Sequence, residues 1–158
     1  MPRERTRMKK LDRKLFDAVR ASDIEGVTRA IDEKANLQAR DKFGETPLHC
    51  ASDIEIMRLL VANEAVVDAR NNAGETALLI AVVNGDPKLV RALLESGADP
   101  QASDDSRNTP SSYAKGWRNV GIEFDRIVAD VAAQHEKERM TGRVIKEELP
   151  NRKEEQAP

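Results

Sequence analysis

The chain has 158 residues, of which 34% are charged and 3% aromatic, and its formal net charge is −2 at pH 7. So few aromatic residues argue against an aromatic-lined cofactor pocket and against a base-stacking surface for single-stranded nucleic acid. A single cysteine, Cys50, excludes an internal disulfide and any zinc site that needs two cysteines, and no apolar run is long enough to span a membrane. We expect a monomer of a reducing compartment, cytoplasmic or nuclear, that uses no metal, cofactor or membrane.

The charge is divided unevenly along the chain. Residues 1–14 hold seven basic and two acidic side chains, residues 15–133 carry a net charge of −7, and residues 134–158 are balanced. Residues 1–10 are interpreted as a basic N-terminal arm, which is either solvated or offered to nucleic acid or another acidic surface. The acidic body makes nucleic acid the weaker alternative and indicates a partner protein with a basic patch.

Residues 11–133 contain an internal repeat. The segment DKFGETPLHCA at 41–51 matches NNAGETALLIA at 71–81, and an offset of 33 residues pairs Leu60 with Leu93 and Ala65 with Ala98. The period predicts four units, at about 11–40, 41–70, 71–103 and 104–133.

Each unit has the signals of one turn and two helices. Gly44 and Gly74 stand in polar turns that need a positive φ, and Thr46-Pro47 has the residue types of a helix start. A second helix begins at Asp86-Pro87 and is ended by Gly97. Because one such pair cannot bury its own apolar face, the pattern predicts an all-α stack of about four helix pairs with β-hairpin-like turns.

Some positions depart from the pattern. The unit 41–70 is three residues short before Asp53, so its first helix is predicted to be truncated. Glu64 and Arg107 replace glycines at turn positions, and Gly26 replaces an apolar residue, which predicts a weakened helix there. The last helix is predicted to run beyond the usual length, and residues 134–158 to form a charged, disordered tail.

The segments GETPLH at 44–49 and LLESGADPQA at 93–102 resemble the ankyrin repeat signature. The resemblance covers about three quarters of the chain. It implies an ankyrin-repeat solenoid in which hairpin tips and first helices form a concave surface that binds other proteins without chemistry, as an adaptor, an inhibitor or an immunity protein. It also implies a structural role for His49, whose side chain would bond the backbone of the adjoining turn.

The partner-binding residues are predicted at the turns and at the end of one first helix, where side chains do not serve the packing of the repeat. They are Lys42, Phe43, Glu45, Asn72, Ala73, Glu75, Val83, Asn84, Arg107 and Asn108. Two questions remain open from the residues alone: whether Phe43 packs against the next unit or faces a partner, and whether Trp117 packs under the last helix or binds.

No catalytic site is predicted. His49 and Cys50 are adjacent, but neighbours on a helix do not face each other, and Cys50 is interpreted as a buried small hydrophobe. The sequence has no phosphate-binding glycine loop. The protein is therefore predicted not to be an enzyme.

Overall fold

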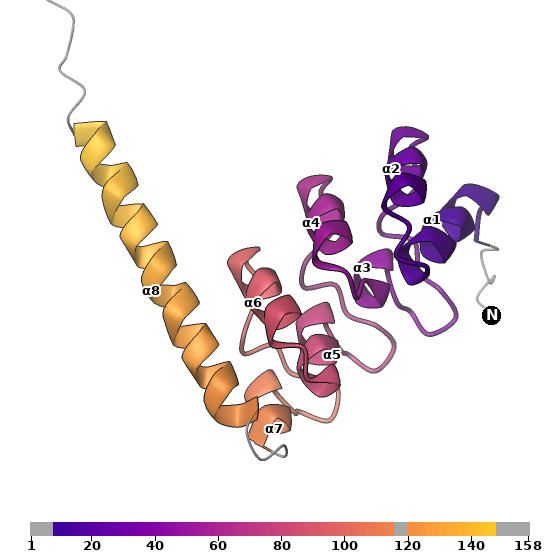
Figure 1. The fold of residues 1–158 in the computed structure, drawn as a ribbon. Coiled ribbons are helices and arrows are strands. Elements are labelled where there is room, and N and C mark those ends of the chain that lie inside the picture. Colours follow the sequence, from indigo (N-terminus) through magenta and orange to yellow (C-terminus); the bar gives the residue numbers. More distant parts are fainter. Residues whose placement is uncertain (1–7, 116–119, 148–158) are drawn as a thin grey trace, which may run out of the picture.

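The computed structural model describes residues 8–115 and 120–147. Eight helices lie in these ranges: α1 (Lys10–Arg20), α2 (Ile24–Asp32), α3 (Pro47–Cys50), α4 (Ile54–Ala62), α5 (Ala77–Asn84), α6 (Pro87–Glu95), α7 (Pro110–Lys115) and α8 (Val120–Glu147). They stack in two rows, with α1, α3, α5 and α7 in one and α2, α4, α6 and α8 in the other, and each helix contacts the next in its row (Figure 1). The protein is an all-α solenoid of helix pairs.

The second helices of the first three units begin in the same way. The carboxylates of Asp23, Asp53 and Asp86 accept hydrogen bonds from the first backbone N–H groups of α2, α4 and α6. Such a cap satisfies donors that have no partner inside the helix. The three helices then end in equivalent turns, where Lys34, Glu64 and Gly97 have φ values of 68°, 70° and 91°. Glu64 thus takes the left-handed turn position at which the next unit has Gly97.

The first helices differ more in length. The helix α3 has four residues, whereas α5 has eight and ends at the left-handed Gly85. The predicted truncation of α3 is confirmed, and its cause is the three-residue gap before Asp53. Ala51 has an extended backbone and joins α3 directly to the cap of α4.

Leucine, isoleucine, valine and alanine fill the space between the two rows. Leu15, Leu48 and Leu78 lie at matching places on α1, α3 and α5, and all three are buried. Leu60 and Leu93 hold the equivalent positions on α4 and α6 and are 0% and 1% exposed. One continuous core therefore runs along the stack, as a repeat that cannot bury its own apolar face requires.

Gly26 has a packing role that the sequence did not reveal. A Cβ atom at this position would lie 2.3 Å from Asp23 Oδ2 and 3.1 Å from the Cβ atom of Ala18 on α1. The glycine thus leaves room for the capping carboxylate and for the close approach of α1. A larger residue would press against both, so Gly26 also serves the packing of α1 against α2, and the weakening of the helix stays a prediction.

The tail prediction was wrong for residues 134–147, which continue α8 without a break. These residues are mostly good helix formers. Two pairs of exposed side chains one turn apart also interact along the helix, Gln134 with Glu138 and Glu136 with Arg139. Polar composition alone does not distinguish such a helix from a disordered segment. Residues 148–158, the rest of the predicted tail, lie outside the described ranges.

Helix α8 covers the last unit. Phe124, Ile127 and Val131 are buried, and Asp130 Oδ2 lies 3.3 Å from Arg91 Nη2 on α6. Figure 1 shows the remainder of the helix extending past the end of α6. None of the described helices is both long and apolar enough to cross a membrane.

Candidate partner-binding face

Three turns of one design precede the first helices of the last three units. We call them the first finger (41–45), the second finger (71–75) and the third finger (104–108). Each is closed by two backbone hydrogen bonds of 3.0 Å, one from the N–H of its first residue to the carbonyl of its last and one from the N–H of its fourth residue to the carbonyl of its first. No described residue lies in a β-strand, so the hairpins of the prediction are turns without a ladder.

The first residue of each finger fixes the loop from inside. Asp41 Oδ1 accepts hydrogen bonds from the N–H groups of Phe43 and Glu45, at 2.8 and 3.0 Å. Asn71 does the same in the second finger, and Asp104 accepts from the N–H of Asn108 at 2.8 Å. A side-chain oxygen in this place rigidifies a tight turn.

Neighbouring fingers are joined to each other. The N–H of Asn72 donates to the carbonyl of Phe43, and the N–H of Asp105 donates to that of Ala73, both at 3.0 Å. Gly44 has φ of 75°, and a Cβ atom there would lie 2.3 Å from Asn72 Oδ1. The glycine is therefore needed both for the turn and for the contact between fingers. The backbone of the fingers forms one rigid edge.

The structure divides the ten predicted binding residues into two groups. Six have exposed side chains that form no hydrogen bond or ion pair between units: Lys42, Phe43, Ala73, Val83, Asn84 and Arg107. Four others help to build the fingers: Glu45, Asn72, Glu75 and Asn108. The Asn72 amide donates to the carbonyl of Lys42, and Glu75 accepts from Asn71 at 2.8 Å. For this second group, the expectation that the side chains do not serve packing was wrong.

Phe43 lies at the tip of the first finger with 57% of its surface exposed. Lys42 Nζ is 4.8 Å from the centre of its ring. For the first of the two open questions, the ring does not pack under the next unit, and its contact with a partner stays a prediction. Trp117, the subject of the other, lies outside the described residues, as do residues 1–7 of the basic arm. Lys9 and Lys10 are exposed at the start of α1.

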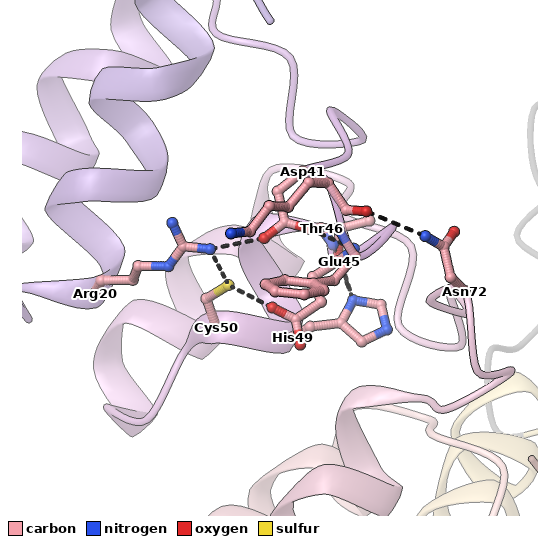
Figure 2. A network of polar contacts seen from close by, with 9 residues as sticks. Arg20, Asp41, Glu45, Thr46, His49, Cys50 and Asn72 are labelled. Carbon is pink, nitrogen blue, oxygen red and sulfur yellow. Dashed lines mark hydrogen bonds and ion pairs between the residues drawn. The ribbon is translucent and has the colours of Figure 1, made fainter. Parts of the chain in front are cut away.

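A polar cluster joins α1 to the first finger and α3 (Figure 2). Arg20 Nη2 donates to Asp41 Oδ2 at 2.8 Å and to Cys50 Sγ at 3.5 Å. The thiol in turn donates to Glu45 Oε2 at 3.6 Å. Acceptor atoms of Asp41, Glu45 and Cys50 lie within 4.8 Å of one another, a grouping that could suggest a metal site. The Arg20 guanidinium already supplies the positive charge that these groups need.

The chemistry of Cys50 is that of a protonated thiol. Burial raises its pKa to about 11, although the Arg20 guanidinium favours the thiolate. The side chain is half-buried rather than fully buried, because it faces this polar cluster as well as the core. A thiol with so high a pKa is a poor nucleophile near neutral pH.

The structure places His49 in a structural role. Its Nδ1 atom accepts from the N–H of Thr46 at 3.1 Å, which closes the start of α3, and its Nε2 atom lies 3.0 Å from the carbonyl oxygen of Glu75 in the next unit. Nε2 carries the proton, because only a donor satisfies a carbonyl oxygen. Burial lowers the pKa of His49, although the bond to Glu75 opposes this effect. The neutral imidazole thus ties two units together.

The third finger is fixed by a buried carboxylate. Burial favours the neutral acid, but hydrogen bonds from the Asn108 N–H and the Tyr113 hydroxyl outweigh it and lower the pKa of Asp104. The Tyr113 hydroxyl lies 2.9 Å from Asp104 Oδ2. Tyr113 stands where Cys50 and Ile80 stand in the earlier units. At this position the terminal unit thus has a hydroxyl group, whereas the second unit has a thiol and the third has an aliphatic side chain.

An open groove of about 720 Å³ lies between α1 and the first finger. Arg13, Phe16 and Arg20 line it from α1, and Lys42, Phe43 and Glu45 from the finger. The sequence predictions missed the three residues of α1. The repeat offset of 63 residues places Arg20 opposite Val83, which was selected, so the same alignment could have identified Arg20.

The fold defines the protein as a helical repeat protein whose fingers lie next to one another along one edge. A family model of ankyrin repeats, in three copies, matches residues 15–104. The chain belongs to the ankyrin repeat family, as the sequence predicted.

Among curated proteins, the chain is similar to the mitochondrial disaggregase of Bos taurus. The two are 38% identical over 111 residues, which are 70% of this chain and 11% of the relative. The chain thus spans about a tenth of that relative, in which the matching region is one small part of a much longer protein.

Proposed function

We propose that this protein binds a partner protein through the face made by its fingers and first helices, and that it carries out no chemistry of its own. The observation that carries the proposal is the combination of a rigid finger backbone with exposed tip side chains. A loop that is already ordered loses little conformational freedom on binding, so its exposed side chains add affinity efficiently.

The non-enzymatic part of the proposal is supported by the state of His49 and Cys50, the adjacent pair that resembles a base and a nucleophile. The Cys50 thiol has a pKa of about 11, and both ring nitrogens of His49 are engaged in contacts that build the repeat. Neither is offered to a substrate. We propose an adaptor, inhibitor or immunity role for a monomer in a reducing compartment, and the small share of the disaggregase relative that matches supports a module that serves another activity.

Photo-crosslinking at single positions tests the proposed face. A benzophenone amino acid replaces Phe43, Ala73 or Val83 on the proposed face, and Arg58 as a matched position on the opposite row of helices. All four positions are exposed. We expect one and the same protein from a cell lysate to be crosslinked at the first three positions and not at Arg58. Equal labelling at all four positions, or labelling at Arg58 alone, would refute the proposal.

A further inference from the structure

We propose that the groove between α1 and the first finger binds an acidic peptide segment that carries an apolar side chain for Phe43. This inference rests on the proposed function and names the chemistry of the partner at one end of the proposed face. The groove combines accessible cations with an exposed aromatic ring, and no other finger offers this combination.

The accessible charge of the groove is basic. Of its three carboxylates, Asp41 is engaged by Arg20 and by two N–H groups of the first finger, with 10% of its side chain exposed. Glu45 is half-buried and accepts from Cys50. Asp17 is the exposed carboxylate that remains.

Three cations of the groove are exposed. Arg13 and Lys42 face it from opposite walls, and Arg20 keeps 48% of its side chain exposed while one of its nitrogens holds Asp41 and Cys50. The net charge of residues 15–133 is negative, which by itself predicts a basic partner. In the groove, however, the exposed side chains are mainly cations, so a ligand there meets positive charge. Charged groups that meet across an interface are complementary, so the accessible charge of the groove selects the charge of the segment that fits it.

The exposed aromatic surface of the groove is provided by Phe43. Phe43 is exposed on a turn whose backbone is fixed by Asp41, and Phe16 is buried beneath Arg20, whose guanidinium carbon is 5.2 Å from the ring centre. An exposed aromatic ring on a rigid turn, surrounded by charged groups, has the composition of a binding hot spot. An apolar side chain of the ligand would cover Phe43 while neighbouring carboxylates meet Arg13 and Lys42.

The second finger provides a matched control within the chain. It has the same turn, with Gly74 at φ of 77°, but carries Asn72 and Ala73 where the first finger carries Lys42 and Phe43. The double variant Lys42→Asn/Phe43→Ala therefore gives the first finger side chains that the same turn already accommodates. Circular dichroism melting would verify that this variant folds.

The experiment is a selection of displayed random 12-residue peptides on the full-length protein, followed by fluorescence anisotropy with the enriched peptides. We expect the enriched set to be acidic and to contain a large apolar residue. The double variant should bind about 30-fold more weakly, the loss typical of removing an aromatic hot spot. Arg13→Gln should weaken binding less, and should reduce its dependence on salt. Arg58→Gln, an exposed charge on the other row, should leave binding unchanged.

The outcomes separate this inference from the proposed function. Enriched peptides that are basic or neutral, or whose binding survives the double variant, overturn the acidic-peptide inference. If basic or neutral peptides are enriched and bind less tightly to the Ala73→Glu variant of the second finger, the acidic-peptide inference is overturned, but the proposed binding face stands. The same selection is run on the double variant, and equal enrichment of peptides on the two proteins also overturns the inference. The crosslinking experiment tests the proposed function independently. An RNA oligonucleotide that binds the groove more tightly than the acidic peptides would overturn it as well.

Discussion

The units at 41–70 and 71–103 share one fold but reach it with different local structure. In the third unit α5 has eight residues and ends at Gly85, and α6 ends before Gly97. In the second unit α3 has four residues, no glycine follows it, and Glu64 takes the left-handed position. The finger, the buried leucines and the aspartate cap are the same in both. Contacts between units thus determine this fold. The length of the first helix and the residue in the left-handed turn after the second helix can vary without changing it.

The largest effect is expected from the buried leucines that the two units share. Leu60→Ala and Leu93→Ala each leave a cavity and should lower the free energy of unfolding by about 2–5 kcal/mol. Because α4 contacts both α2 and α6, we expect a single urea transition by circular dichroism for either variant. A split transition for Leu60→Ala alone would show that the second unit unfolds independently.

His49→Leu tests the link between the two units. Leu79 already occupies the equivalent position in the third unit, so the size is compatible, but the buried Thr46 N–H loses its acceptor and the Glu75 carbonyl keeps only the Asn71 N–H as a donor. We expect a loss of about 1–3 kcal/mol at pH 7.

The pH dependence of stability provides the control for this variant. The pKa of His49 is lower in the folded protein than its ordinary value of 6.5. The unfolded chain therefore binds the proton more readily, and the stabilisation is complete above pH 6.5 and declines as the pH falls below it. The stability of the wild-type protein should decrease from pH 7 to pH 5 more steeply than that of His49→Leu. Parallel curves would contradict the structural role of the neutral imidazole.

The reactivity of Cys50 provides a test of the polar cluster. The third unit has Ile80 at the position of Cys50. With a pKa of about 11, the thiol should react with a disulfide reagent at pH 7 at least about tenfold more slowly than free cysteine. The rate should continue to rise up to about pH 11, and Arg20→Gln should slow it further by removing the cation that favours the thiolate. Ser52→Cys in a Cys50→Ser background is the exposed control. Equal rates for the two cysteines at pH 7 would be inconsistent with the burial of Cys50.

The smallest effect is expected at the helix ends. Glu64→Gly removes the cost of a side chain at φ of 70° and should stabilise the protein by about 0.5–1 kcal/mol. Gly97→Ala should destabilise it by a similar amount, because no atom within 4 Å would meet the new methyl group and backbone strain alone acts. Chemical denaturation gives both values. The same sign for the two changes would refute equivalence of the two turns.

Much of the fold and part of the candidate site could be predicted from the sequence. The repeated turn glycine, the Thr-Pro helix start and the leucines at a fixed offset predicted the stack, the short α3 and the left-handed Glu64. Lys42 and Phe43 were selected as turn residues that do not serve the packing of the repeat, and the structure shows their side chains exposed. Arg13, Phe16 and Arg20 were missed, because contact between α1 and the first finger depends on how the first two units are stacked.

The sequence by itself determined the period, and with it the class of fold, because each unit carries its own turn, caps and apolar stripe. Only the tertiary structure decided which polar side chains form hydrogen bonds within and between the fingers and which remain exposed. It also decided that residues 134–147 form a helix and that Gly26 makes room for Ala18 and Asp23. The physical reason is that caps and apolar stripes act over a few neighbouring residues, whereas burial and accessible charge depend on what the next unit brings against them.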